Sequence, residues 1–170
     1  FLNRIGADPL WRGAPCAVKA VLPSSVEVTT TTDGMDTRVE TITPVGTLVH
    51  VFRRSEIGAT VFLMEHPLRT PDDFKIQQWI EEHTSYRLDL DPVKAHFAAD
   101  GREGLSLGLL TPREKSAFQF MVENLVGTQE LVYALADYPE TVEELWATMV
   151  NNDVKAARMS ADSPYDYFIT

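Results

Sequence analysis

Val26-Glu27-Val28-Thr29-Thr30-Thr31-Thr32 opens the stretch of sequence that decides the fold of the first half of the chain. β-Branched residues dominate it, and their stiff side chains favour a pleated strand. Asp33-Gly34 follows as a turn signal. Three further strands are predicted beyond it, each separated from the next by a short turn: residues 38–43, 47–54 and 59–65. Short turns join antiparallel neighbours, so residues 26–65 are expected to form a four-stranded meander.

The chain changes character after residue 65. Thr70-Pro71-Asp72-Asp73 combines a capping threonine, a proline at the first helical position and acidic residues near the positive end of the helix dipole, so a helix is predicted to about His83. Thr111-Pro112-Arg113-Glu114 has the pattern of a capping box and predicts a helix that ends at Gly127. Further helices are predicted over 91–101 and 129–136. A last helix from Pro139 is expected to bury one apolar stripe: Val142, Leu145, Trp146, Met149 and Val150.

Two more segments have the composition of buried strands, residues 104–110 and the closing run 165–170. Helices separate them, and a crossover of that length implies parallel strands and an α/β fold. Residues 1–25 are expected to be irregular, because glycine and proline interrupt them. The closing strand is expected to have a further neighbour, so we expect the natural chain to continue past Thr170. The isolated chain is then expected to lack activity and to associate with itself or with a missing second half.

Composition limits the classes of partner. The net charge of −10 argues against nucleic acid, which binds clustered Lys and Arg. No apolar run approaches the roughly 20 residues that a membrane span needs. Cys16 is the only cysteine, so an intrachain disulfide is excluded and the cytoplasm is the expected compartment. The four histidines are scattered, none four residues from another on a predicted helix, so no metal site is expected within this chain.

Three side chains of the first half are candidates for a site. His66 stands beside Glu65 after the fourth predicted strand, and such a pair can shuttle a proton. The alternative is a loop histidine that orders the turn. Arg53 and Arg54 end the third predicted strand and could hold a substrate carboxylate or phosphate. Their alternative is a charged strand end in solvent.

Three further candidates depend on position. Asp8 precedes Pro9 and is either an active-site acid or a turn initiator. Thr111 and Thr170 lie at the carboxyl ends of the two strands predicted to be parallel, which in a barrel face the active site. Thr111 has an alternative role as a helix cap.

Several segments together resemble the uroporphyrinogen decarboxylase superfamily over about residues 40–165. They are Thr43-Pro44-Val45-Gly46-Thr47-Leu48, Glu65-His66-Pro67-Leu68-Arg69-Thr70-Pro71-Asp72-Asp73-Phe74, Trp79-Ile80, Leu131-Val132-Tyr133-Ala134-Leu135-Ala136-Asp137-Tyr138-Pro139-Glu140 and Val142-Glu143-Glu144-Leu145. The resemblance implies a partial (β/α)8 TIM barrel, the amino-terminal portion of one barrel domain over 1–170. Residues 26–65 would be an antiparallel β-meander insertion, and residues 70–170 would supply helices and parallel barrel strands.

The resemblance also implies two reactions. Members of the superfamily decarboxylate tetrapyrrole acetates or transfer methyl groups to or from corrinoids and thiols, the latter with a zinc site in a carboxyl half that this chain lacks. Corrinoid and zinc are therefore expected only for a full-length protein. The decarboxylases carry an arginine-rich opening segment that is missing here, and Asp8 is the nearest match to their catalytic aspartate. Because acids outnumber bases by 25 to 15, the methyl-transfer branch is favoured over a decarboxylase of a polyacidic tetrapyrrole. A non-catalytic ligand-binding αβ module is the third alternative.

Overall fold

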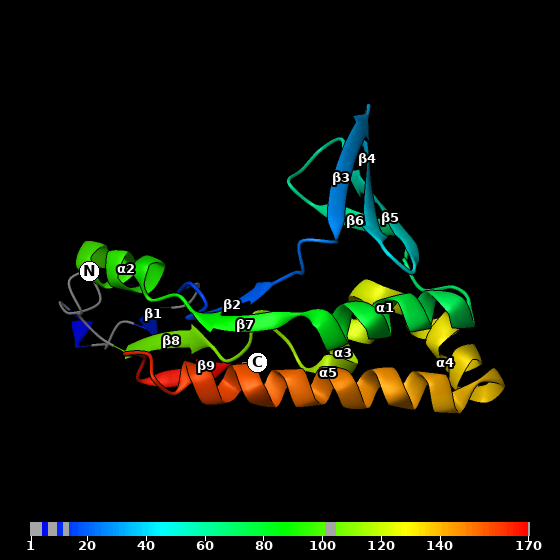
Figure 1. The fold of residues 1–170 in the computed structure, drawn as a ribbon. Helices are drawn as coiled ribbons and strands as arrows, with labels where there is room; N and C mark the ends of the chain where they lie inside the picture. Colours follow the sequence, from blue (N-terminus) through cyan, green and yellow to red (C-terminus); the bar gives the residue numbers. More distant parts are fainter. Residues whose placement is uncertain (1–4, 7–9, 12–13, 101–104, 170) are drawn as a thin grey trace. The chain divides into compact units, whose positions relative to one another are not determined.

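The computed structural model describes residues 5–6, 10–11, 14–100 and 105–169, and they form a mixed α/β structure (Figure 1). The chain divides into two compact units. The parallel-sheet unit comprises Phe1–Val21, Ser85–Ser116 and Asn151–Thr170. The meander unit comprises Leu22–Thr84 and Ala117–Val150.

The meander unit contains the predicted antiparallel sheet. Its strands are β3 (Glu27–Asp33), β4 (Asp36–Thr43), β5 (Gly46–Arg54) and β6 (Val61–Glu65), paired in that order. Asp33 pairs with Asp36 around a turn in which Gly34 has a φ of 59°, a value that favours glycine. β5 has a neighbour on each side. The prediction of a four-stranded meander over residues 26–65 is therefore confirmed.

Helices complete this unit. Helix α1 (Pro71–His83) begins as predicted: the Thr70 side chain accepts from the Asp73 N–H and the Asp73 carboxylate accepts from the Thr70 N–H. A short helix α3 (Ala117–Phe120) continues into a π-helical segment, η2 (Met121–Val126), and Gly127 is the C-cap of this segment. Helices α4 (Thr128–Asp137) and α5 (Pro139–Ser160) follow. Residues 139–150 of α5 belong to the meander unit and 151–160 to the other unit.

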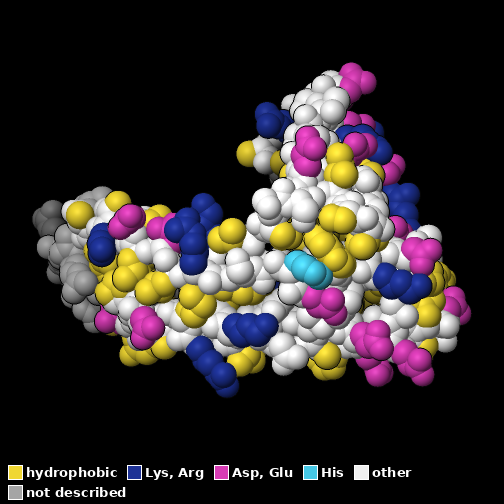
Figure 2. All heavy atoms as spheres, in the orientation of Figure 1, with side chains coloured by type: hydrophobic (Ala, Val, Ile, Leu, Met, Phe, Trp, Pro, Cys, Tyr) yellow, Lys and Arg dark blue, Asp and Glu magenta, His cyan; other side chains and the backbone are white. Residues whose placement is uncertain are grey.

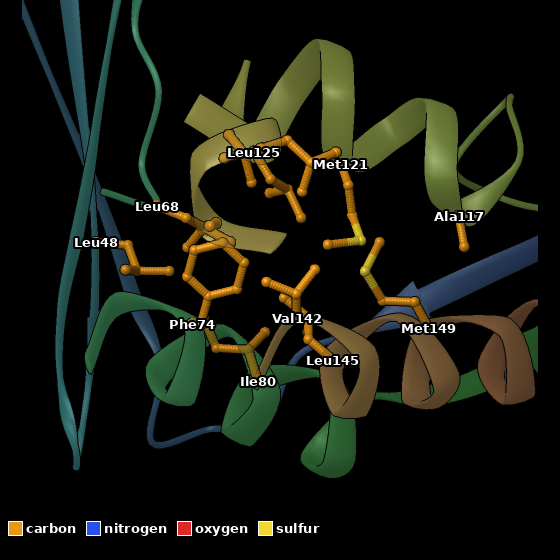
Figure 3. Close-up of a cluster of buried hydrophobic side chains, with 13 residues drawn as sticks. Leu48, Leu68, Phe74, Ile80, Ala117, Met121, Leu125, Val142, Leu145 and Met149 are labelled. Carbon is orange, nitrogen blue, oxygen red and sulfur yellow. The ribbon is translucent and has the colours of Figure 1, made fainter. Parts of the chain in front are cut away.

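The core of the meander unit lies among these helices and one end of β5 (Figure 3). Leu48 of β5 points toward Phe74 and Leu68, and the side chains of Met121 and Met149 point toward each other. The buried residues are Leu48, Leu68, Phe74, Ile80, Ala117, Met121, Leu125, Val126, Leu131, Ala134, Val142, Leu145 and Met149. Trp146 and Val150, predicted to be buried, are 46% and 37% exposed, because the covered face of α5 follows Val142, Leu145 and Met149.

The parallel-sheet unit holds three parallel strands, β1 (Leu10–Trp11), β8 (Leu105–Leu109) and β9 (Tyr167–Ile169), with β8 between the other two. The predicted parallel pairing of the two later strands is confirmed. A separate antiparallel pair joins β2 (Val18–Val21) to β7 (Ser85–Leu88). Helix α2 (Asp91–Asp100) follows β7, and the core of this unit contains Ala14, Ala17, Val93 and Tyr165.

Two expectations for the parallel-sheet unit were wrong. Residues 1–25 are not irregular throughout, since β1 and β2 lie there. The capping pattern at Thr111 does not start a helix: residues 110–115 form turns and bends, and the next helix begins at Ala117. Glu114 has a φ of 64°, which is incompatible with a right-handed helix. A tertiary contact holds the loop after Thr111 instead: Arg113 Nε donates to Asp153 Oδ1 at 2.8 Å.

Candidate functional site

The residues predicted to act in a site fall in different units. Arg53 and Arg54 end β5 and His66 follows β6, so these three belong to the meander unit. Thr111 follows β8 in the parallel-sheet unit. Asp8 and Thr170 lie outside the described residues.

Arg53 is engaged with its cross-strand neighbour Asp36. Its Nε donates to Asp36 Oδ1 at 2.6 Å and its Nη2 donates to Asp36 Oδ2 at 2.7 Å. The hydrogen bonds from Arg53 hold the pKa of the Asp36 carboxyl below its ordinary value. A substrate anion would have to displace this carboxylate. The adjacent Arg54 donates its backbone N–H to the Met35 carbonyl at 3.0 Å and has an exposed side chain.

His66 packs against a helix end. A Cβ added at Gly127, which has a φ of 90°, would lie 3.2 Å from His66 Cε1 and 3.3 Å from Nδ1. The Glu65 carboxylate accepts from Arg69 Nη2 at 2.9 Å. Nearby, the Leu68 N–H donates to the Leu125 carbonyl at 3.0 Å. This geometry favours the alternative in which His66 orders its loop against η2.

The carboxyl end of β8 gathers the most unusual polar groups of the parallel-sheet unit. Leu110 donates its N–H to the Ile169 carbonyl at 2.9 Å and accepts from Ser160 Oγ at 2.8 Å. The next residue, Thr111, is 3% exposed, and its Oγ1 is buried without a hydrogen-bond partner among the described residues. Leaving such a group unpaired costs about 1–3 kcal/mol, so a buried hydroxyl without a partner indicates strain or a role in binding.

The loop after Thr111 has a second unusual feature. Glu114 donates its N–H to the Thr111 carbonyl at 3.1 Å and has a φ of 64°. A non-glycine residue in this left-handed region is uncommon, and such residues cluster at functional sites. Arg113 and Asp153 hold the loop with side chains only 11% and 18% exposed. At the carboxyl end of β8, the central strand of the parallel sheet, a buried hydroxyl is therefore followed by a constrained loop.

Cys16 and Tyr165 lie in the same unit. Cys16 Sγ donates to the Leu109 carbonyl at 3.6 Å, and burial raises the pKa of its thiol. The Tyr165 hydroxyl donates to the Pro15 carbonyl at 2.5 Å, and burial raises the pKa of Tyr165 to about 12. Both groups therefore stay protonated at neutral pH. Each group has one donor hydrogen, which it already gives to a backbone carbonyl, and neither is an activated nucleophile.

Tyr165, Asp153 and the backbone of Glu114 are not among the site residues predicted from the sequence. A signal for one of them is present in the sequence but was not used: Gly108 lies inside a predicted strand, where glycine often marks a close approach. A Cβ at this position would overlap the ring of Tyr165. The roles of the other two residues depend on contacts distant in sequence.

The meander unit has a cavity of its own, with a volume of about 460 Å³. It is lined by Val45, Asp72, Lys75, Ile76, Gln78, Trp79 and Glu82. The indole of Trp79 stacks on the His83 ring with centroids 4.1 Å apart. Gln78 Nε2 donates to Glu82 Oε1 at 2.7 Å and to Thr148 Oγ1 at 2.8 Å, while its Oε1 is buried without a described partner.

Comparison with known proteins gives no match: no family model, no curated protein and no solved structure matches the chain. Within the part of the chain that the structure describes, no three His, Cys, Asp or Glu side chains are grouped so that they could hold a metal ion. In the same residues, no helix has both the length and the apolar character that crossing a membrane requires.

Proposed function

We propose that the chain is the amino-terminal part of a (β/α)8 barrel enzyme of the uroporphyrinogen decarboxylase type. The order of the parallel strands supports this proposal. Within their own sheet, β1, β8 and β9 lie in chain order. Helices lie in both connections, and the first connection also contains the meander and the β2–β7 pair. A barrel is wound in this way, each strand beside the one before it. The remaining strands would come from sequence outside these 170 residues.

The observation that carries the proposal is the buried, unpaired hydroxyl of Thr111 at the carboxyl end of β8. Active sites of such barrels lie at the carboxyl ends of the strands. A hydroxyl kept there without a partner is available to bind a substrate group. Thr111 is thus proposed as a substrate-binding residue, and the loop through Glu114 as the segment that positions it.

We propose methyl transfer to or from a corrinoid as the reaction class, with decarboxylation of a tetrapyrrole as the alternative. The net charge of −10 supports this order, because a polyacidic tetrapyrrole requires positive potential around its site. Corrinoid and zinc are proposed only for the full-length protein. The proposed compartment is the cytoplasm, in keeping with a single cysteine whose thiol is protonated.

A non-catalytic ligand-binding module remains the second candidate, because the cavity of about 460 Å³ beside Trp79 has the volume of a small-molecule site. The candidates differ in what the full natural chain does with substrates. Incubation with a methylated corrinoid and a thiol should yield a thioether if methyl transfer is correct. Release of CO2 from a tetrapyrrole carboxylate, without thioether, would replace the first proposal by its alternative. The ligand-binding module would be favoured if neither product forms and if either compound binds saturably to the wild type but not to Trp79→Ala.

A further inference from the structure

An apolar groove with a volume of about 180 Å³ opens on the helical side of the meander unit. Met121 and Val142 form its floor and are buried. Its walls are Phe118, Leu135 and Trp146, which are 53%, 40% and 46% exposed. The groove has room for one large apolar side chain, and three of the apolar residues that line it are substantially in contact with solvent.

The exposed apolar surface continues beyond the groove. Val150 lies one helical turn after Trp146 on α5 and is 37% exposed. Val132 lies three residues before Leu135 on α4 and is 60% exposed. Residues three or four apart share a helix face, so these two extend the groove along α5 and α4. The result is an elongated apolar surface of the kind that receives the apolar face of a helix.

Every charged residue in the segment that forms this surface is acidic. Residues 117–150 contain no lysine, arginine or histidine. Their charged residues are Glu123, Glu130, Asp137, Glu140, Glu143 and Glu144. Glu143 lines the groove itself. Figure 2 shows acidic side chains gathered at the end of the meander unit where α4 and the first turns of α5 lie.

These acidic side chains affect the titration of the neighbouring Tyr138. Burial first, and then the carboxylates of Asp137, Asp73 and Glu130, raise the pKa of Tyr138 between α4 and α5. Acids in the first turn of a helix stabilise its dipole, which accounts for Glu140. That effect ends within the first turn, so it does not account for the absence of any base over four helical segments.

The π-helical segment is a separate observation at the same place. Met121 on the groove floor is its first residue, and the Gly127 N–H donates to the Val122 carbonyl, five residues back, at 3.1 Å. π-Helical turns are rare and occur frequently at functional sites. The groove floor therefore includes the first residue of this irregular segment, and Phe118 of the groove wall belongs to α3 just before it.

We propose that this groove, with its acidic rim, binds a basic amphipathic helix of a partner protein. The apolar face of the partner would occupy the groove, and its Lys or Arg residues would face Glu143, which lines the groove, and Glu140, three residues before it on the same helix face. Charge complementarity decides between this partner and a second copy of the chain. A two-fold dimer through this surface would bring the acidic rim against itself, which is unfavourable.

The experiment uses the 170-residue chain and a fluorescein-labelled synthetic peptide of about 18 residues, or about five helical turns, with Leu at helical spacing and Lys elsewhere. Fluorescence anisotropy should show saturable one-to-one binding, with a Kd on the order of 10 μM. Raising the salt from roughly 50 to 500 mM should weaken it about tenfold. A peptide with the same Leu positions and Glu in place of Lys should not bind.

Variants distinguish binding of the peptide in the groove from nonspecific attraction of the peptide to the acidic protein. Leu135→Ser and Trp146→Ala should each weaken binding about tenfold or more, since both residues are exposed groove walls. Ile57→Ser removes an apolar side chain that is 98% exposed elsewhere in the unit and should have no effect. The triple variant Glu140→Gln/Glu143→Gln/Glu144→Gln should weaken binding and flatten its salt dependence. Its matched control, Glu27→Gln/Asp33→Asn/Glu56→Gln, removes as many exposed acids from the sheet region and should change little.

Several results would overturn the proposal. They are the absence of saturable binding, unchanged affinity in folded Leu135→Ser, and an equal loss in the two triple variants. Sedimentation supplies a further one: a dimer of the chain that Leu135→Ser dissociates would assign the groove to a second copy instead.

Discussion

The Tyr165 hydroxyl donates a hydrogen bond of 2.5 Å to the backbone carbonyl of Pro15, a residue 150 positions away in sequence. The same ring lies over Gly108 in the middle of β8. Tyr165 therefore ties the segment before β2 to the central strand of the parallel sheet. Both its ring and its hydroxyl therefore contribute to the packing around β8.

Tyr165→Phe should lower the free energy of unfolding by about 1 kcal/mol, because the ring stays while the Pro15 carbonyl loses its donor. The control is Tyr167→Phe, whose side chain is 57% exposed and which should change stability little. Urea denaturation at neutral pH measures both. Equal effects of the two variants would contradict the assigned hydrogen bond.

Alkaline pH should act through the same residue. Burial raises the pKa of Tyr165 from an ordinary value of 10.0 to about 12, so the folded state binds its proton more tightly than the unfolded state does. Its contribution to stability is present in full below pH 10 and is lost as the pH rises through about 12. The decline of stability between these two pH values should therefore be shallower in Tyr165→Phe than in the wild type. Parallel curves would refute the shift.

Gly108→Ala should destabilise the chain by about 2 kcal/mol, because a Cβ at this position would overlap the Tyr165 ring. Gly58→Ala is the matched control, since a Cβ there would lie no nearer than 4.0 Å to its closest neighbour, the Thr60 nitrogen. Thermal unfolding compares them. In the double variant Gly108→Ala/Tyr165→Ala the two costs should not add, because the second change removes the overlap caused by the first.

Arg53 can be assigned to structure or to substrate by a double-mutant cycle. Arg53→Gln and Asp36→Asn should each cause a small loss of stability at pH 7, and together little more than either alone. The pKa of Asp36 is lowered from 3.8, so its contribution is present above that pH and lost as the pH falls below it. Urea denaturation at pH 7 and at pH 3 tests this. Unchanged stability in Arg53→Gln, with loss of activity in the full natural chain, would restore the substrate-binding role.

Local signals in the sequence predicted part of this fold. β-Branched runs and a glycine turn define the meander, and the Thr70 cap defines the start of α1. The pair β2–β7 escaped prediction because each strand has only four residues and their partners are distant in sequence. At Thr111 the local capping pattern was overridden, since the ion pair of Arg113 with Asp153 holds a loop in which Glu114 is left-handed.

The candidate site was predictable in position but not in its details. The predicted strand over residues 104–110 correctly located Thr111 at the carboxyl end of a parallel strand. Its missing hydrogen-bond partner could not be inferred, because satisfaction of a hydroxyl depends on packing that no local pattern reports. The groove escaped for a related reason. Apolar periodicity in α5 predicted that Trp146 would be buried, but a helix buries only the face that its neighbours cover.

The central claim is that Thr111, at the carboxyl end of β8, binds substrate. The kinetics of Thr111→Val in the full natural chain test this claim most directly. Valine matches the shape of threonine and removes the unpaired hydroxyl, so the melting temperature should stay the same or rise. We predict that kcat/KM for methyl transfer falls about tenfold or more in Thr111→Val, while Thr111→Ser keeps most of it. Thr70→Val is the control: it removes the cap of α1, lowers stability by about 1 kcal/mol and leaves kcat/KM unchanged. Wild-type kcat/KM in Thr111→Val would contradict the claim.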